Sequence, residues 1–148
     1  MKTLSILGYL GMIGALAGLL ITGSLFSSHP YIIFLQAMAF LLFIWARVTF
    51  GRRSFHLMAD PTEGDLVTSG PYRHIRHPIY AAMCLFAWAG IAGHWSRGAG
   101  LYGALILASA GTRILCEEAL VSARYPEYAR YKDVYKRQSL GCSLSADA

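Results

Sequence analysis

Two long apolar runs near the start of the chain constrain its fold more than any other feature. Residues 4–26 contain no charged side chain, and residues 31–50 contain only Arg47. At roughly 1.5 Å per helical residue, either run can cross a hydrocarbon core about 30 Å thick. Unpaired backbone groups are costly in lipid, so such runs cross it as helices. The sequence therefore predicts an all-α integral membrane protein.

The remaining composition agrees with this class and predicts a single domain. Of the 148 residues, 55% are hydrophobic and only 14% are charged, far from the balance of a soluble domain. Two further apolar stretches, 79–95 and 98–116, predict a bundle of about four transmembrane helices, the last continuing to about Tyr125. A signal peptide is the alternative for the first run, but that run exceeds the usual apolar length and further spans follow it.

Small residues predict where these helices contact each other. Gly14 and Gly18 form a Gly-x-x-x-Gly pair in the first run, which would let a neighbouring helix approach closely. Gly100, Ala104 and Ala108 recur every four residues and predict the face on which the fourth helix meets the third.

The positive charges predict the orientation in the membrane. The net charge is +5, and the segment 51–78 carries Arg52, Arg53, Arg73 and Arg76, whereas the 27–30 turn carries no charge. Arginine-rich short loops stay on the cytoplasmic side, so this loop and both termini are expected there, in a bacterial inner membrane. The charges suit an anionic membrane surface better than nucleic acid. The histidines are scattered without paired spacing, so no metal site is expected.

A polar, aromatic stretch at 64–80 interrupts the apolar runs. Gly70-Pro71 is a turn signal, and Pro78 restricts His77 to an extended or turn conformation before the third helix. Arginine, histidine and tyrosine side chains on a constrained loop at the mouth of a helix suit a small polar ligand. The alternative is a basic anchor for the membrane surface.

Charged residues near the end of the fourth apolar stretch mark a second candidate region. Arg113 and Glu117 are four residues apart, so they share one helix face, and Glu118 follows directly. A charge at the edge of a membrane span is expensive and indicates a functional site. A mutual salt bridge between Arg113 and Glu117 is the structural alternative.

Several of these residues occur together in an ordered pattern. Leu66-Val67-Thr68-Ser69-Gly70-Pro71-Tyr72 precedes Arg76-His77-Pro78-Ile79-Tyr80, and Glu117-Glu118 precede Tyr128 and Tyr131. This pattern, from about Gly64 to Tyr131, resembles the isoprenylcysteine carboxyl methyltransferase and phospholipid methyltransferase superfamily of integral membrane enzymes.

The resemblance implies S-adenosylmethionine as methyl donor and a lipidic or prenylated acceptor, most simply an isoprenylcysteine-type carboxylate. It implies Arg113 and Glu118 as catalytic residues, Arg113 facing the acceptor and Glu118 assisting deprotonation of an amine acceptor. It also implies a set of cofactor-binding residues on the cytoplasmic side: Gly64, Asp65, Leu66, Val67, Tyr72, His77, Pro78, Ile79, Tyr80 and Glu117. The alternatives are a phospholipid amine methyltransferase and a non-catalytic membrane subunit or lipid-binding module of the same fold.

The end of the chain is interpreted separately. Residues 1–132 are expected to form the single methyltransferase-like domain, with a cofactor loop at 51–78 and a short terminal helix after Pro126. Asp133-Val-Tyr-Lys-Arg-Gln138 resembles the translation of a transposon-end sequencing adapter, and the residues after it have no periodicity. The segment 133–148 is therefore taken as a non-native tail and carries no functional interpretation.

Overall fold

The computed structural model describes residues 2–51 and 69–124, and these residues form helices and turns without a strand. The helices are α1 (Lys2–Ile21), α2 (Pro30–Phe50), the short 3-10 helix η2 (Gly70–Arg73), α3 (Pro78–Gly93) and α4 (Arg97–Arg124). Within the described ranges, α1, α2 and α4 are long and apolar enough to cross a membrane, while α3 is a shorter apolar helix. The predicted all-α membrane bundle is confirmed. The 52–68 part of the expected cofactor loop and the expected terminal helix lie outside the described residues.

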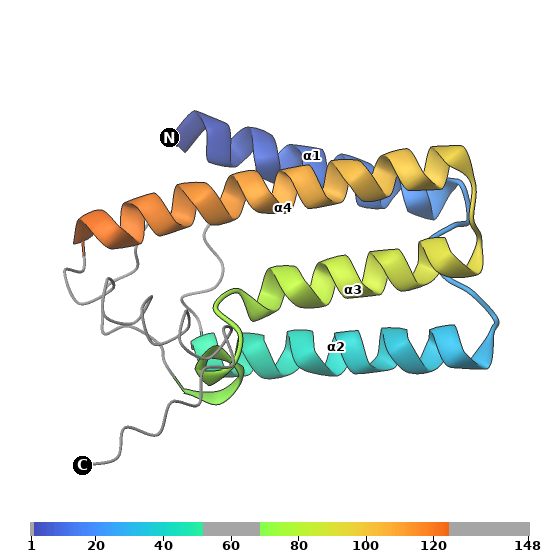
Figure 1. Ribbon diagram of the computed structural model, residues 1–148, viewed down its shortest axis with the longest axis horizontal. Coiled ribbons are helices and arrows are strands. Elements are labelled where there is room, and N and C mark those ends of the chain that lie inside the picture. Colours follow the sequence, from blue (N-terminus) through green and yellow to red (C-terminus); the bar gives the residue numbers. More distant parts are fainter. Residues whose placement is uncertain (1, 52–68, 125–148) are drawn as a thin grey trace, which may run out of the picture.

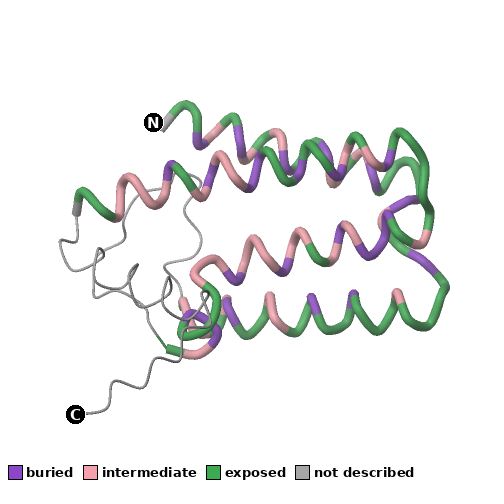
Figure 2. The backbone as a smooth tube through the Cα atoms, in the orientation of Figure 1, coloured by how far each residue is buried: buried purple, intermediate pink, exposed green. Residues whose placement is uncertain are grey.

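The long helices pack as two pairs that meet along a common seam. In Figure 1, α1 lies along α4 and α2 lies along α3, and the third and fourth helices run antiparallel as expected from their short joint. The core of buried residues gathers where the pairs meet: Ala15, Leu19, Ala87, Ile91, Ala99 and Ile106. The outward faces, green in Figure 2, carry large apolar side chains such as Leu7, Phe34 and Leu101. A bilayer rather than water suits such a surface.

The first helix ends earlier than the apolar pattern predicted. A helix was expected to continue to Phe26, but α1 ends at Ile21 because Gly23 adopts a left-handed φ of 69°. The amide of Ser24 donates to the Leu19 carbonyl at 2.9 Å, and the amide of Gly23 donates to Leu20 at 3.1 Å. These two bonds form a Schellman motif, which satisfies the last carbonyls of the helix and turns the chain.

Glycines do bring α1 close to α4, although only one of the two expected ones takes part. A Cβ on Gly18 would overlap the ring of Tyr102, and one on Gly11 would lie 2.7 Å from Ser109 Oγ. Gly14, by contrast, has no heavy atom within 4 Å of its Cβ position among the described residues. The α1–α4 contact therefore depends on Gly11 and Gly18, together with Gly8, where a Cβ would lie 3.1 Å from the Ser109 carbonyl oxygen.

The face predicted for the contact between α4 and α3 was wrong. Ala104 and Ala108 are exposed. Instead, Gly103 faces α3, because a Cβ there would lie 2.8 Å from the Ile91 side chain and 2.9 Å from Trp88. The large side chains of α3 thus pack against Gly103 of α4, which is adjacent to Ala104 in the sequence but lies on a different face of the helix.

Candidate functional site

Arg113 on α4 is the centre of a buried polar network. Only 5% of the residue is exposed. Its Nε donates to the hydroxyl of Tyr80 at 2.8 Å, its Nη1 to the backbone carbonyl of Ser5 at 3.3 Å, and its Nη2 approaches Glu117 Oε1 at 3.3 Å. A buried guanidinium is stable only with such partners. Three elements, α1, α3 and α4, supply them.

Tyr80 joins the third helix to this network. It lies in the first turn of α3, which begins at Pro78, where the missing amide and fixed φ of proline favour helix initiation. Its hydroxyl accepts a hydrogen bond from Arg113 and donates one to Glu117 Oε1. The Glu117 side chain keeps 27% of its surface exposed. Arg113, Tyr80 and Glu117 therefore form a closed triangle that reaches the surface through Glu117.

A second ion cluster lies beside the first. Glu118 Oε1 is 3.4 Å from Arg76 Nη1 and 3.3 Å from His77 Nε2. The two basic side chains come from the turn just before α3, whereas Glu118 comes from α4. The adjacent acids Glu117 and Glu118 thus contact different partners, and together they tie the start of α3 to the end of α4.

Tyr72 lies apart from these clusters but within their electrostatic reach. It is buried in η2, and its ring lies 5.5 Å from that of Phe50 at the end of α2. Burial, together with the negative charge of Glu117, raises the pKa of the Tyr72 hydroxyl above its usual value, and Arg47 opposes this shift. Tyr72 is therefore a neutral hydroxyl at physiological pH.

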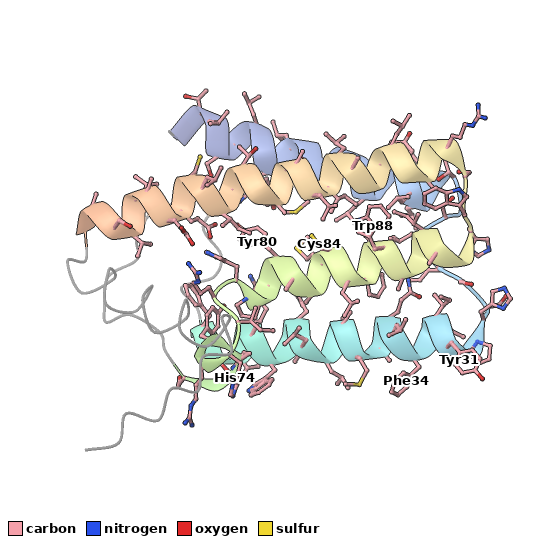
Figure 3. All side chains as sticks on the ribbon, in the orientation of Figure 1. Tyr31, Phe34, His74, Tyr80, Cys84 and Trp88 are labelled. Carbon is pink, nitrogen blue, oxygen red and sulfur yellow. The ribbon has the colours of Figure 1, made fainter. Side chains whose placement is uncertain are left out.

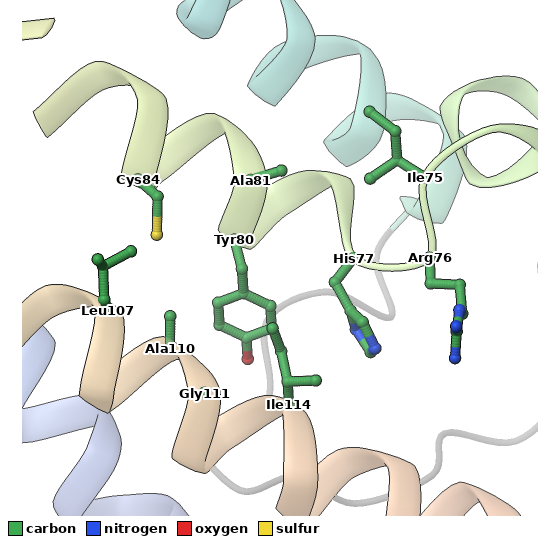
Figure 4. Close-up of a pocket in the computed structure, with 10 residues that line it drawn as sticks. All are labelled: Ile75, Arg76, His77, Tyr80, Ala81, Cys84, Leu107, Ala110, Gly111 and Ile114. Atoms are coloured by element: carbon green, nitrogen blue, oxygen red, sulfur yellow. The ribbon is translucent and has the colours of Figure 1, made fainter. Parts of the chain in front are cut away.

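A cavity of about 430 Å³ lies between α3 and α4 (Figure 4). Arg76, His77 and Tyr80 form its polar end, whereas Cys84 and Leu107 lie toward the other end. The rest of its lining is apolar or small: Ile75, Ala81, Ala110, Gly111 and Ile114. Figure 3 shows Tyr80 and Cys84 on the side of α3 that faces α4. The arrangement suits a molecule with an apolar chain and a polar end.

The structure brings several of the predicted site residues together. Arg113, Tyr80 and Glu117 contact one another, and His77 contacts Glu118. Pro78 is buried at the start of α3 and Ile79 is partly buried beside it, and both contribute only apolar side chains. The predictions for Gly64, Asp65, Leu66 and Val67 lie outside the described residues.

Two contributors from α1 escaped the sequence analysis. The Ser5 carbonyl accepts from Arg113, and the Tyr9 ring centroid lies 5.3 Å from the guanidinium carbon. An isolated serine and tyrosine in an apolar helix give no local signal of such a contact. The one available hint was the glycine content of that helix, which allows close approach to a neighbour.

Comparison with known proteins agrees with this geometry. The model of the Isoprenylcysteine carboxyl methyltransferase (ICMT) family matches residues 28–123. No curated protein and no solved structure matches the chain. The matched range holds the network residues Tyr80, Arg113 and Glu117 and the whole lining of the cavity, but not α1. Because the match covers well over half of the chain and its helices form an apolar bundle, this protein belongs to the isoprenylcysteine carboxyl methyltransferase family of membrane methyltransferases.

Proposed function

We propose that this protein transfers a methyl group from S-adenosylmethionine to a membrane-resident carboxylate of the isoprenylcysteine type. The observation that carries the proposal is the position of Tyr80. It lines the apolar cavity between α3 and α4, and its hydroxyl bonds both Arg113 and Glu117. A lipidic chain in the cavity would therefore bring its polar end to the buried network.

Arg113 is the residue best suited to hold an acceptor carboxylate. A guanidinium presents a planar fork that matches the two oxygens of a carboxylate. At 5% exposure it lies in a low-dielectric environment, where such an ion pair is stronger than in water. Nη2 of Arg113 can release Glu117 and bind the acceptor carboxylate instead, while Nε of Arg113 keeps its bond to Tyr80. That exchange would leave the Glu117 carboxylate to the cationic groups of the donor.

The residues around Glu117 fit the chemistry of the donor. A partly exposed carboxylate suits an ammonium or sulfonium cation, and the rings of Tyr72 and Tyr80 suit an adenine or a cation. When bound, S-adenosylmethionine supplies a methyl group on a positively charged sulfur. The protein then has only to position the reactants and exclude water. We also propose Gly64, Asp65, Leu66 and Val67 for the donor site, as the resemblance to the family implies.

A phospholipid amine is the second candidate acceptor. The observation in its favour is the pair of Glu118 and His77, whose carboxylate and imidazole lie 3.3 Å apart at the polar end of the cavity. Such a pair can accept the proton that an amine loses on methylation. The buried cation of Arg113, however, favours an anionic acceptor.

The proposed site faces the cytoplasm. Arg47, Arg73 and Arg76 lie at the end of the bundle where α2 ends and α3 begins, whereas the 22–29 connection at the opposite end carries no arginine or lysine. Positive residues are enriched on the cytoplasmic side of membrane proteins. The soluble donor would enter there, and the lipidic acceptor would arrive laterally from the bilayer, here proposed to be a bacterial inner membrane.

Calorimetry of S-adenosylmethionine binding to the protein in nanodiscs tests the donor site. Wild type is expected to bind saturably at micromolar donor, and Glu117→Ala is expected to weaken binding at least about tenfold. Tyr31→Ala, at the opposite end of the bundle, serves as the control. Equal affinity in wild type and Glu117→Ala would refute the donor site, and no binding at millimolar donor would indicate a non-catalytic membrane module.

Methyl transfer assays then identify the acceptor. Labelled methyl is offered with a farnesylated cysteine carboxylate or with phosphatidylethanolamine. Transfer to the carboxylate supports the first candidate, whereas transfer to the amine alone establishes the second.

A further inference from the structure

The first helix, α1, contacts the Arg113 guanidinium through an aromatic ring and a backbone carbonyl. The Tyr9 ring lies under the guanidinium, with 5.3 Å between its centroid and Cζ, and the Ser5 carbonyl accepts from Nη1. A cation within about 6 Å of a ring centroid is attracted to the ring face, and more strongly where water is excluded. Arg113 is therefore held from α1 as well as from α3 and α4.

Close packing of α1 against α4 makes these contacts possible. Gly8 is buried, and a Cβ at this position would lie 3.1 Å from Arg113 Cγ and 3.1 Å from the Ser109 carbonyl. Gly11 lies close to Ser109 in the same way. A Cβ at Gly8 would require the Arg113 side chain or the α4 backbone to move by a few tenths of an ångström. The close approach at Gly8 and Gly11 thus brings Tyr9, which follows Gly8 in the chain, beside the Arg113 guanidinium.

The contact of Tyr9 with Arg113 differs in kind from the hydrogen bonds of the guanidinium. Tyr80, Glu117 and the Ser5 carbonyl bond nitrogens at the edge of the guanidinium. Guanidinium N–H groups lie in the plane of the group, so these bonds fix its edges. Tyr9 instead places its ring face toward the guanidinium carbon, with 5.3 Å from Cζ to the ring centroid, so this contact restrains the position of the whole group rather than of one N–H.

We infer that Tyr9 is a positioning residue, which holds the Arg113 guanidinium in the orientation needed to grip the acceptor carboxylate. This inference rests on the proposed function of Arg113. It assigns a part of the site to α1, which lies outside the residues 28–123 that match the family. Tyr9 acts on the reaction through Arg113 and needs no contact with either reactant.

The inference predicts a selective effect on turnover. Loss of the ring face in Tyr9→Leu is expected to lower kcat roughly 5- to 30-fold, because small errors of orientation are costly in a positioned reaction. The affinity for S-adenosylmethionine should stay within about twofold of wild type, since the donor is assigned to Glu117. Tyr9→Phe keeps the ring face and should restore most of kcat. A purely structural role for Tyr9 would instead lower the unfolding temperature and leave the kcat of the folded protein unchanged.

Steady-state kinetics with the farnesylated cysteine acceptor tests the inference, with Tyr31→Leu on α2 as the control for the same substitution at an exposed site. Loss of kcat in Tyr9→Leu, together with recovery in Tyr9→Phe, supports it. A kcat within about twofold of wild type in Tyr9→Leu overturns it. If Tyr9→Leu does not fold, Tyr9→Met replaces the ring with an unbranched apolar chain and is judged by the same criterion.

A spectroscopic measurement separates this inference from the proposed function. In protein with isotopically labelled arginine, the Nε–H resonance of Arg113 reports the field of the nearby ring and the bond to Tyr80. It should move in Tyr9→Leu and stay in place in Tyr31→Leu. If wild type transfers no methyl group to any acceptor, the proposed function fails. The resonance then still decides whether Tyr9 positions Arg113, and an unmoved signal overturns that placement.

Discussion

Removal of one hydroxyl, in Tyr80→Phe, tests the central network most directly. The Tyr80 hydroxyl takes a 2.8 Å bond from Arg113 Nε and gives one to Glu117. A hydrogen bond to a charged group contributes about 1.5–3 kcal/mol. The variant would break two such bonds. Glu117, however, is 27% exposed and can bond water, and Arg113 keeps its bonds to the Ser5 carbonyl and the Glu117 carboxylate. The net loss should therefore be close to one bond, or about 1.5–3 kcal/mol.

If Arg113 acts in the transition state, this loss appears in the rate. It corresponds to a fall in kcat/KM of roughly 10- to 150-fold for methyl transfer to the farnesylated cysteine acceptor. The unfolding temperature in nanodiscs should fall as well, because a buried charge has lost a partner. Tyr102→Phe is the matched control on α4, where the ring packs over Gly18. If Tyr80→Phe behaves like Tyr102→Phe in both measurements, the network does not hold Arg113 as argued.

Two further predictions concern the cavity and the buried hydroxyl of Tyr72 in η2. Gly111 lines the cavity and has no heavy atom within 4 Å of its Cβ position among the described residues. Gly111→Leu should therefore fill the cavity and lower kcat/KM for the lipidic acceptor by about tenfold or more. The affinity for the donor should not change. Gly14→Leu, equally open but on α1, should leave acceptor kinetics unchanged, and equal kinetics in the two variants would show that the acceptor lies elsewhere. The raised pKa of Tyr72 favours the neutral hydroxyl in the folded protein. The contribution of this group to the free energy of unfolding is therefore full below the usual tyrosine pKa of about 10, and it is lost as pH rises through the pKa of the folded protein. Denaturant titrations across alkaline pH should show a smaller loss in Tyr72→Phe than in wild type, and parallel curves would contradict the burial of the hydroxyl.

Features that depend on local sequence were predictable. The apolar runs gave the helices, and the spacing of Arg113 and Glu117 placed both on one face of α4, where they do contact. The proline at position 78 marked the start of α3. In each case a few neighbouring residues decide the outcome, because helix initiation and i,i+4 proximity follow from backbone geometry alone.

Features that depend on helix rotation were not predictable. A soluble helix marks its inner face with apolar residues, but in lipid both faces are apolar, so the pattern does not show which side packs inward. The expected Ala104 and Ala108 face is exposed for this reason, and Gly103 packs instead under Trp88 and Ile91. The contact of Ser5 with Arg113 joins residues 108 positions apart and depends on the same rotation.

The length of α3 explains why the polar clusters form where they do. Its 16 residues extend about 24 Å, less than a hydrocarbon core of about 30 Å, whereas the 28 residues of α4 extend about 42 Å. In a bilayer, the turn before α3, with Arg76 and His77, would therefore lie close to the hydrocarbon core, where unpaired polar groups are costly. The longer α4 continues past this point and supplies Glu118 to both basic residues. A helix shorter than the hydrocarbon core thus brings charged groups to the mouth of an apolar cavity, which is the arrangement that the proposed reaction between a soluble donor and a lipidic acceptor requires.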